Sequence, residues 1–291
     1  MPSPSPSHIE TGRPLPRRPL GRTGQEVTLF GLGGEGVLRT YGRTAEAVRV
    51  VHRALDQGVN YFDTAPAYAG SMDYLGEALG ERRRDIFLAA KTHDRTRDGS
   101  LRLLEECLTR LRTDHLDLWQ LHDLRTEHDL RTIFGPGGAI EALTEARDDG
   151  RVRFLGLTGH HDPAILVEAM RRFDFDTVLV ALNAADVHYL PFIPTVPAEA
   201  ERRGLGVIGM KVYAAGTLVA RGGLAPRDAM SYVLSLPGVS TTIIGCRTPE
   251  EVDENAEIAR GFSPLDESQR QQLEQRTRAA ARAFNSYKRA V

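Results

Sequence analysis

Residues 59–91 read VNYFDTAPAYAGSMDYLGEALGERRRDIFLAAK, and this stretch contains the unit that repeats along the chain. An apolar run, Val59–Phe62, is followed by an amphipathic segment, Met72–Leu79, and then by a second apolar run, Ile86–Ala90. Short runs that are apolar at nearly every position are typical of strands buried on both faces of a parallel sheet. The segment between them has the period of about 3.6 residues that is expected of a helix covering such a sheet.

The same alternation occurs about eight times from residue 17 onward. The expected strands are 27–33, 59–62, 86–90, 116–120, 154–158, 177–181, 207–210 and 242–245. The expected helices are 44–57, 72–79, 100–111, 139–149, 163–172, 194–203, 226–234 and 249–259. We therefore predict the α/β class and a single (β/α)8 TIM barrel. A doubly wound sheet fits less well, because GLGGEG at 31–36 lacks the GxGxxG spacing of a dinucleotide-binding turn.

The two ends of the chain are expected to lie outside the barrel, which spans residues 17–263 and carries an N-terminal hairpin. Residues 1–16, MPSPSPSHIETGRPLP, are rich in proline and serine and predict a disordered leader. Residues 264–291 form the C-terminal tail, in which the polar stretch Asp266–Tyr287 predicts a helix packed on the outside of the barrel.

Composition excludes several classes of protein. The 37 basic and 39 acidic side chains give a net charge of −2, so there is no basic excess for a nucleic-acid partner. We find no apolar run of the ~20 residues that a membrane span needs. The chain has two cysteines, Cys107 and Cys246, which cannot form a disulfide framework. A cytoplasmic protein with a large core is expected.

Ionisable side chains follow several of the predicted strands, where barrels of this kind carry their reactive groups. Asp63 follows the second apolar run, Lys91 the third and His122 the fourth, and Tyr68 lies in the loop after Asp63. Of the 37 basic residues three are lysines, and Lys91 and Lys211 both follow strands. Lysine at these positions, in a chain that otherwise uses arginine, indicates a role for a compact ammonium group.

The set Asp63, Tyr68, Lys91 and His122 suits carbonyl reduction. An ammonium beside Tyr68 is expected to lower the pKa of the phenol, a carboxylate keeps that ammonium charged, and an imidazole orients a carbonyl. The structural alternative is that Asp63 caps the following turn and Tyr68 packs beneath it. Two further functions stay open: a nucleotide-binding sensor or partner module with little turnover, and a Schiff-base aldolase that uses Lys91.

These residues resemble the aldo-keto reductase family. The matching segments are GRTGQEVTLFGLG (21–33), NYFDTAPAYAGSMDYLGEAL (60–79), FLAAKT (87–92), DLWQLHD (117–123) and IIGCRTPEEVDEN (243–255). LGLTGHHDP (155–163) and GLGVIGMKVYAAG (204–216) are similar to a bacterial branch with TGHxDP and GMK signatures. The resemblance implies NAD(P)H-dependent reduction of aldehydes or ketones without metal. It also implies Tyr68 as general acid/base, Lys91 and Asp63 as the pair that lowers its pKa, and His122 as the group that orients the substrate.

The resemblance also implies which residues hold the dinucleotide. In the family, the loop after the eighth strand and the next helix bind the adenosine phosphates; here these are Gly245, Cys246, Arg247, Thr248, Glu251, Glu254 and Asn255, with Gly33 from the first strand. Near the nicotinamide the expected residues are Thr158, Asn183, Met210 and Lys211, which differ from those common in the family. A carboxylate at Glu251 favours a ribose 2′-OH, whereas Arg247 favours a phosphate, so both NADP(H) and NAD(H) stay open.

The substrate is expected to be a small carbonyl compound that contacts Tyr41, His160 and Tyr213. No metal is expected, because adjacent histidines such as His160 and His161 usually point in different directions and the zinc-motif spacing is absent. The stretch Leu124–Gly138 is long for a βα loop, which suggests a lid. The sequence leaves the oligomeric state open.

Overall fold

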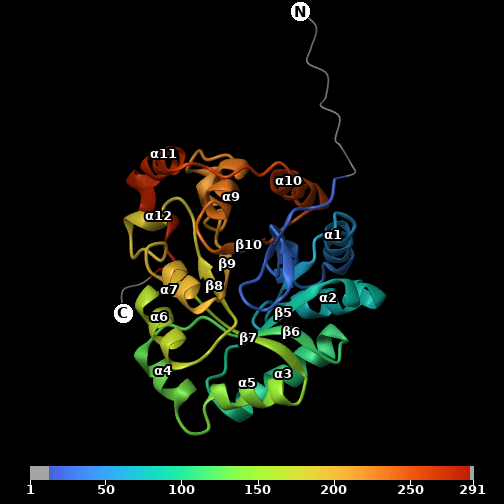
Figure 1. Ribbon diagram of the computed structural model, residues 1–291. Helices are drawn as coiled ribbons and strands as arrows, with labels where there is room; N and C mark the ends of the chain where they lie inside the picture. Colours follow the sequence, from blue (N-terminus) through green and yellow to red (C-terminus); the bar gives the residue numbers. More distant parts are fainter. Residues whose placement is uncertain (1–12, 289–291) are drawn as a thin grey trace, which may run out of the picture.

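The computed structural model describes residues 13–288, and its centre is a closed barrel of parallel strands in the order β10-β3-β4-β5-β6-β7-β8-β9. These strands are β3 (Phe30–Gly33), β4 (Tyr61–Asp63), β5 (Phe87–Thr92), β6 (Leu116–Leu121), β7 (Val152–Gly159), β8 (Thr177–Ala181), β9 (Gly206–Met210) and β10 (Val239–Ile244). Each is almost wholly buried, as their apolar runs predict. The predicted (β/α)8 barrel is confirmed (Figure 1).

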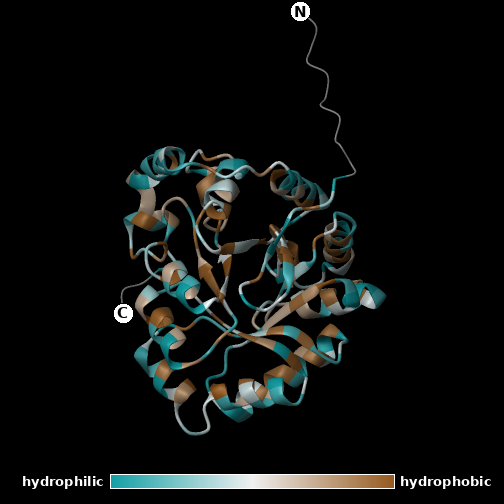
Figure 2. Ribbon diagram, in the orientation of Figure 1, coloured by the Kyte–Doolittle hydropathy of each residue, from teal (hydrophilic) through white to brown (hydrophobic). Residues whose placement is uncertain are grey.

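Helices surround the barrel. Those that connect the strands are α1 (Thr44–Asp56), α2 (Ser71–Leu79), α3 (Arg97–Leu111), α5 (Ala139–Asp148), α6 (Pro163–Arg172), α7 (Val196–Arg203), α9 (Pro226–Leu234) and α10 (Pro249–Arg260). Short 3₁₀ turns η1 (Gly36–Arg39), η2 (Gly80–Asp85) and η3 (Asp186–His188) and the one-turn helix α8 (Thr217–Ala220) lie in the loops. Asp162 and Thr248 accept backbone N–H groups and so fix the starts of α6 and α10. In Figure 2 the barrel strands are mostly apolar and the polar residues lie mainly on the outer helices.

A hairpin closes one end of the barrel. Its strands, β1 (Arg17–Pro19) and β2 (Glu26–Thr28), pair antiparallel, and Leu20 and Val27 join the apolar cluster inside the barrel. Leu20 lies against Gly206 at the start of β9, so the hairpin covers the amino-terminal ends of the strands. The expected strand 27–33 is therefore two strands, β2 in the hairpin and β3 in the barrel. The carboxyl ends of the strands are not covered by the hairpin and are accessible to form a functional site.

The predicted lid segment 124–138 contains a helix, α4 (Glu127–Phe134). Thr126 and Asp129 form a capping box at its start, and the side chains of Leu130 and Ile133 are buried. The sequence did not predict this helix, because its apolar residues are too few and span too short a segment to show a helical period. The segment is anchored in the core rather than built as an open loop.

The C-terminal tail is not one outer helix. It consists of α11 (Glu267–Thr277), η4 (Arg278–Ala280) and α12 (Ala281–Phe284), and the chain then turns inward. The Asn285 amide donates to the Ala185 carbonyl at 3.0 Å, and the buried Lys288 ammonium pairs with Asp186. The tail therefore reaches the loop after β8, which a polar helical pattern did not predict.

The predicted leader falls mainly on residues 1–12, which lie outside the described residues. Leu15 is buried, and the Pro16 carbonyl accepts the Leu29 N–H at 3.0 Å, so the folded part reaches back at least to Leu15. No helix within residues 13–288 is long and apolar enough to cross a membrane.

Candidate active site

A cavity of about 900 Å³ lies beside the carboxyl ends of the strands and is lined by all four residues predicted to carry the chemistry: Asp63, Tyr68, Lys91 and His122. Asp63 ends β4, Lys91 lies near the end of β5, and His122 follows β6 directly. Because these parallel strands are neighbours in the barrel, their ends bring the three side chains together.

Lys91 and Asp63 form a buried ion pair at the base of the cavity. Each side chain is 1% exposed. The Lys91 ammonium donates to the Asp63 carboxylate and, at 2.8 Å, to the Thr64 carbonyl. The Gln120 amide donates to the second Asp63 oxygen at 3.1 Å. Burial raises the pKa of Asp63 and lowers the pKa of Lys91, and their mutual attraction opposes both shifts.

The Tyr68 hydroxyl faces the His122 imidazole. Its oxygen lies 3.4 Å from Nε2, and the two rings are nearly perpendicular, at 86°. The Lys91 nitrogen lies 4.9 Å, and the Arg39 guanidinium carbon 5.1 Å, from the centre of the Tyr68 ring. Tyr68 thus stands between an imidazole and two cations.

Burial and the carboxylates of Asp63 and Glu35 raise the pKa of Tyr68 well above its ordinary value. The expected lowering by Lys91 is wrong for this state of the protein, because Asp63 neutralises the ammonium and the phenol is desolvated. Burial, with help from Lys91, lowers the pKa of His122 to about 2. Near neutral pH the site therefore holds a protonated phenol next to a neutral imidazole.

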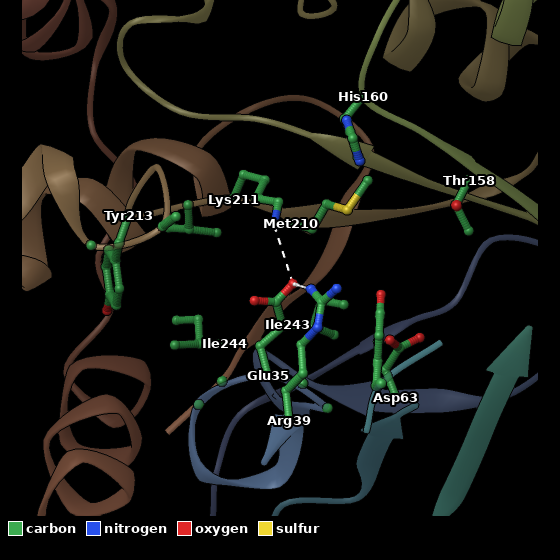
Figure 3. Close-up of a pocket in the computed structure, with 18 of the residues that line it drawn as sticks. Glu35, Arg39, Asp63, Thr158, His160, Met210, Lys211, Tyr213, Ile243 and Ile244 are labelled. Atoms are coloured by element: carbon green, nitrogen blue, oxygen red, sulfur yellow. Dashed lines mark hydrogen bonds and ion pairs between the residues drawn. The ribbon is translucent and has the colours of Figure 1, made fainter. Parts of the chain in front are cut away.

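A second ion-paired group crosses the cavity. The Glu35 carboxylate pairs with Arg39 at 3.0 Å and with Lys211 at 3.3 Å, so it joins the loop after β3 to the loop after β9 (Figure 3). Sequence analysis selected Lys211 but missed Glu35, Arg39 and Gln120. Gln120 could have been found from its spacing. It lies two residues before His122, so both side chains project from the same face of the chain.

The region after β10 forms the other end of the cavity, where Gly245, Arg247, Glu251, Glu254 and Asn255 line it. The Glu251 carboxylate accepts the Arg247 backbone N–H at 2.7 Å, and Asn255 accepts the Tyr213 hydroxyl at 2.6 Å. A Cβ on Gly245 would lie 2.6 Å from the Glu35 backbone, so only glycine allows this close approach of the two loops. Tyr213, predicted at the substrate, therefore lies with the predicted cofactor residues, on the opposite side from Asp63 (Figure 3).

Four predicted residues do not line the cavity within the described chain: Tyr41, Asn183, Cys246 and Thr248. Tyr41 is 81% exposed. The Asn183 amide donates to the Tyr287 hydroxyl at 2.8 Å and its oxygen accepts the Ala185 N–H, so its polar atoms hold the C-terminal tail. Cys246 is buried against Asn255, and Thr248 caps α10.

The remaining predicted residues Gly33, Thr158, His160, Met210 and Lys211 line the cavity. The Thr158 hydroxyl accepts the Asp123 N–H at 2.8 Å and joins the ends of β6 and β7. Burial lowers the pKa of His160 to about 4, against the opposing charge of Asp123. His160 and His161 do not point apart as expected, because their rings stack with centroids 4.7 Å apart.

The geometry suits the delivery of a proton to an oxygen in the cavity, because a protonated phenol lies at hydrogen-bonding range of a neutral imidazole. A sequence model described as "Aldo/keto reductase family" matches residues 29–228 of the chain. This match covers more than half of the chain and includes β3 to β9, from which the four central residues come.

Similarities to curated proteins and to solved structures support the same family. Pyridoxal 4-dehydrogenase of Microbacterium luteolum is 27% identical over 82% of this chain and 91% of its own length. L-Galactose dehydrogenase of Arabidopsis thaliana is 27% identical over 82% of this chain and 86% of its own. The thermostable aldo-keto reductase Tm1743 superposes with a TM-score of 0.71 at 26% identity, covering 90% of this chain and all of that one. The holo form of AKR11C1 from Bacillus halodurans shares the fold, with a TM-score of 0.76 at 24% identity over 91% of this chain and 97% of its own. The chain belongs to the aldo-keto reductase family of NAD(P)-dependent oxidoreductases.

Proposed function

We propose that this enzyme reduces small aldehydes or ketones to alcohols, with Tyr68 as the proton donor to the carbonyl oxygen. One observation carries the proposal: the Tyr68 hydroxyl, the His122 imidazole and the buried Lys91–Asp63 pair come from three neighbouring strand ends and meet in one cavity. General acid catalysis of this kind contributes about 10²–10⁴-fold to a rate.

The cavity fits a dinucleotide. Its far end combines the start of α10, where the helix dipole favours an anion, with the Arg247 side chain and the close approach of two loops at Gly245. We propose that Arg247 and Asn255 hold the adenosine end, while Thr158, Met210 and Lys211 lie beside the nicotinamide. When bound, the reduced nicotinamide supplies the hydride that reaches the carbonyl carbon.

The chain's own residues manage the proton. The raised pKa of Tyr68 keeps its phenol protonated until an alkoxide develops on the substrate. Because the pKa of His122 is lowered, its imidazole stays neutral and is available to hydrogen-bond and orient the carbonyl oxygen. The Arg39 guanidinium beside the ring partly opposes the rise in the pKa of Tyr68 and so favours release of the proton.

For the substrate we propose contact with His160, which lines the cavity together with Tyr68 and His122. Tyr213 is better assigned to the cofactor side, since its hydroxyl is committed to Asn255. The residues around the cavity do not identify one carbonyl substrate, so the test uses a panel of aldehydes and ketones.

The test follows loss of NADPH or NADH absorbance with a panel of aliphatic, aromatic and sugar-derived aldehydes and ketones. We expect oxidation of one cofactor with at least one carbonyl class. Tight binding of nucleotide without oxidation across the panel would overturn the proposal in favour of a sensor. Borohydride trapping of a carbonyl compound on Lys91 would overturn it in favour of an aldolase; we expect no trapping, because the Lys91 nitrogen is committed to Asp63 and Thr64.

A further inference from the structure

Asp123, His160 and His161 form a cluster at the rim of the cavity. Their candidate ligand atoms all lie within 4.8 Å of one another. Nε2 of His160 lies 3.3 Å, and Nε2 of His161 3.7 Å, from the same Asp123 oxygen, Oδ1. The three side chains are 13%, 21% and 11% exposed for Asp123, His160 and His161 respectively. Two stacked imidazoles therefore face one buried carboxylate oxygen.

The backbone around Asp123 is built to aim its carboxylate. Asp123 has φ of 54°, in the left-handed region that is uncommon for residues other than glycine. Thr158 fixes this conformation, because its hydroxyl accepts the Asp123 N–H and its carbonyl accepts the Leu124 N–H, both at 2.8 Å.

The two Asp123 oxygens have different environments. Oδ2 accepts a hydrogen bond from the Arg125 guanidinium at 2.7 Å, which fixes the orientation of the carboxylate. Oδ1 is buried and accepts no hydrogen bond from any described residue, although two imidazole nitrogens face it. A buried carboxylate oxygen left in this state costs free energy unless a cation or a proton sits against it.

Two of the three separations between ligand atoms fit a metal ion, and the third, between the two imidazoles, is at most 4.8 Å. Zinc bonds of ~2.0–2.2 Å with tetrahedral to octahedral angles put neighbouring ligand atoms roughly 3.0–3.6 Å apart. The two separations from Asp123 Oδ1 lie within or about 0.1 Å outside this range. The Arg125 guanidinium already pairs with the other oxygen of Asp123, so a bound cation shares this carboxylate with it.

We propose that Asp123, His160 and His161 bind a divalent ion of the late first-row transition metals, with Zn²⁺ as the best match. Two imidazoles and one carboxylate are the donors that zinc accepts, and three protein ligands leave one coordination position open. Because Asp123 and His160 line the cavity, an ion that they held would lie beside the space where the substrate is expected. The site is distinct from the Tyr68 hydroxyl and Lys91, and metal binding does not depend on the proposed reduction.

The experiment titrates the chelator-treated, full-length protein with Co²⁺ and then with Zn²⁺, without NADPH or substrate. We expect one equivalent of Co²⁺ to give a visible d–d absorption band, which Zn²⁺ abolishes by displacement. Asp123→Asn and His161→Gln should each weaken binding by at least the ~10–100-fold that loss of an outer-shell partner causes. His93→Gln is the matched control, because His93 lines the same cavity outside the cluster, and it should bind like the wild type.

A second measurement keeps the proposal testable if the variants fold poorly. Crystals of the wild-type protein soaked in Zn²⁺ should give an anomalous peak within bonding distance of all three side chains. Absence of saturable binding, equal affinity in His161→Gln, or a peak elsewhere would each overturn the proposal. Because no turnover is measured, a failure here is separate from a failure of the proposed reduction.

Discussion

The Lys91 nitrogen lies 4.9 Å from the centre of the Tyr68 ring while it is hydrogen-bonded to the Asp63 carboxylate. The ammonium therefore acts on the ring of Tyr68, and its charge is shared with a buried acid. Burial of the phenol and the carboxylates of Asp63 and Glu35 outweigh the nearby cations, so the phenol keeps its proton in the resting protein. Proton donation by Tyr68 is the role that we propose and that the predictions below test.

The pH dependence of carbonyl reduction should have an alkaline limb and no limb near neutrality. The pKa of Tyr68 is raised, so the fraction of protonated donor stays constant through neutral pH and falls only in strongly alkaline solution. The pKa of His122 is lowered to about 2, so this imidazole does not titrate in the same range. The measurement is kcat across pH for the wild type and His122→Gln. A limb near pH ~6.5, the ordinary pKa of histidine, that disappears in the variant would contradict this assignment.

Breaking the Lys91–Asp63 pair should cost stability as well as activity. Lys91→Met leaves the Asp63 carboxylate buried without its partner, and removal of one member of such a pair costs about 3–5 kcal/mol. Chemical denaturation of Lys91→Met, Asp63→Asn and the double variant gives the free energies of unfolding. The double variant should lose less stability than the sum of the single losses, because the partners are coupled. Strictly additive losses would show that the pair does not act as a unit.

Glu251 should disfavour NADPH relative to NADH. Its carboxylate lines the cofactor end of the cavity and is held there by the Arg247 N–H, so it repels the phosphate that distinguishes NADPH. Glu251→Gln should tighten NADPH binding by about tenfold, a change of ~1.4 kcal/mol, and leave NADH affinity nearly constant. Fluorescence titration with both cofactors at low salt measures this. An unaltered NADPH affinity would rule out the carboxylate as a determinant.

The barrel and three of the four central residues were predictable because one geometric rule links them. Apolar runs identify parallel strands, and the carboxyl ends of such strands meet at one mouth. Asp63, Lys91 and His122 follow from that rule without knowledge of any long-range contact. The hairpin boundary at Thr28 and Phe30 did not, since a continuous apolar run does not show where the chain changes its pairing partner.

The predicted residues whose surroundings differ from expectation depend on contacts between distant parts of the chain. Asn183 was expected at the cofactor, but its amide bonds Tyr287, which lies 104 positions further along. Tyr41 was expected at the substrate, and its loop leaves it in solvent. His160 and His161 were expected to diverge, but both face Asp123 because the end of β7 carries the chain beside the end of β6. Periodicity in one segment contains no information about such pairings.

The most direct measurement of the central claim is the turnover of Tyr68→Phe with a carbonyl substrate reduced by the wild type. The variant keeps the ring between Lys91 and Arg39 and removes the hydroxyl alone, so the dissociation constant of the reduced cofactor should stay the same. We predict that kcat falls by about 10²–10⁴, the contribution of a positioned general acid. A kcat equal to that of the wild type, with intact folding and cofactor binding, would contradict the assignment of Tyr68 as the proton donor.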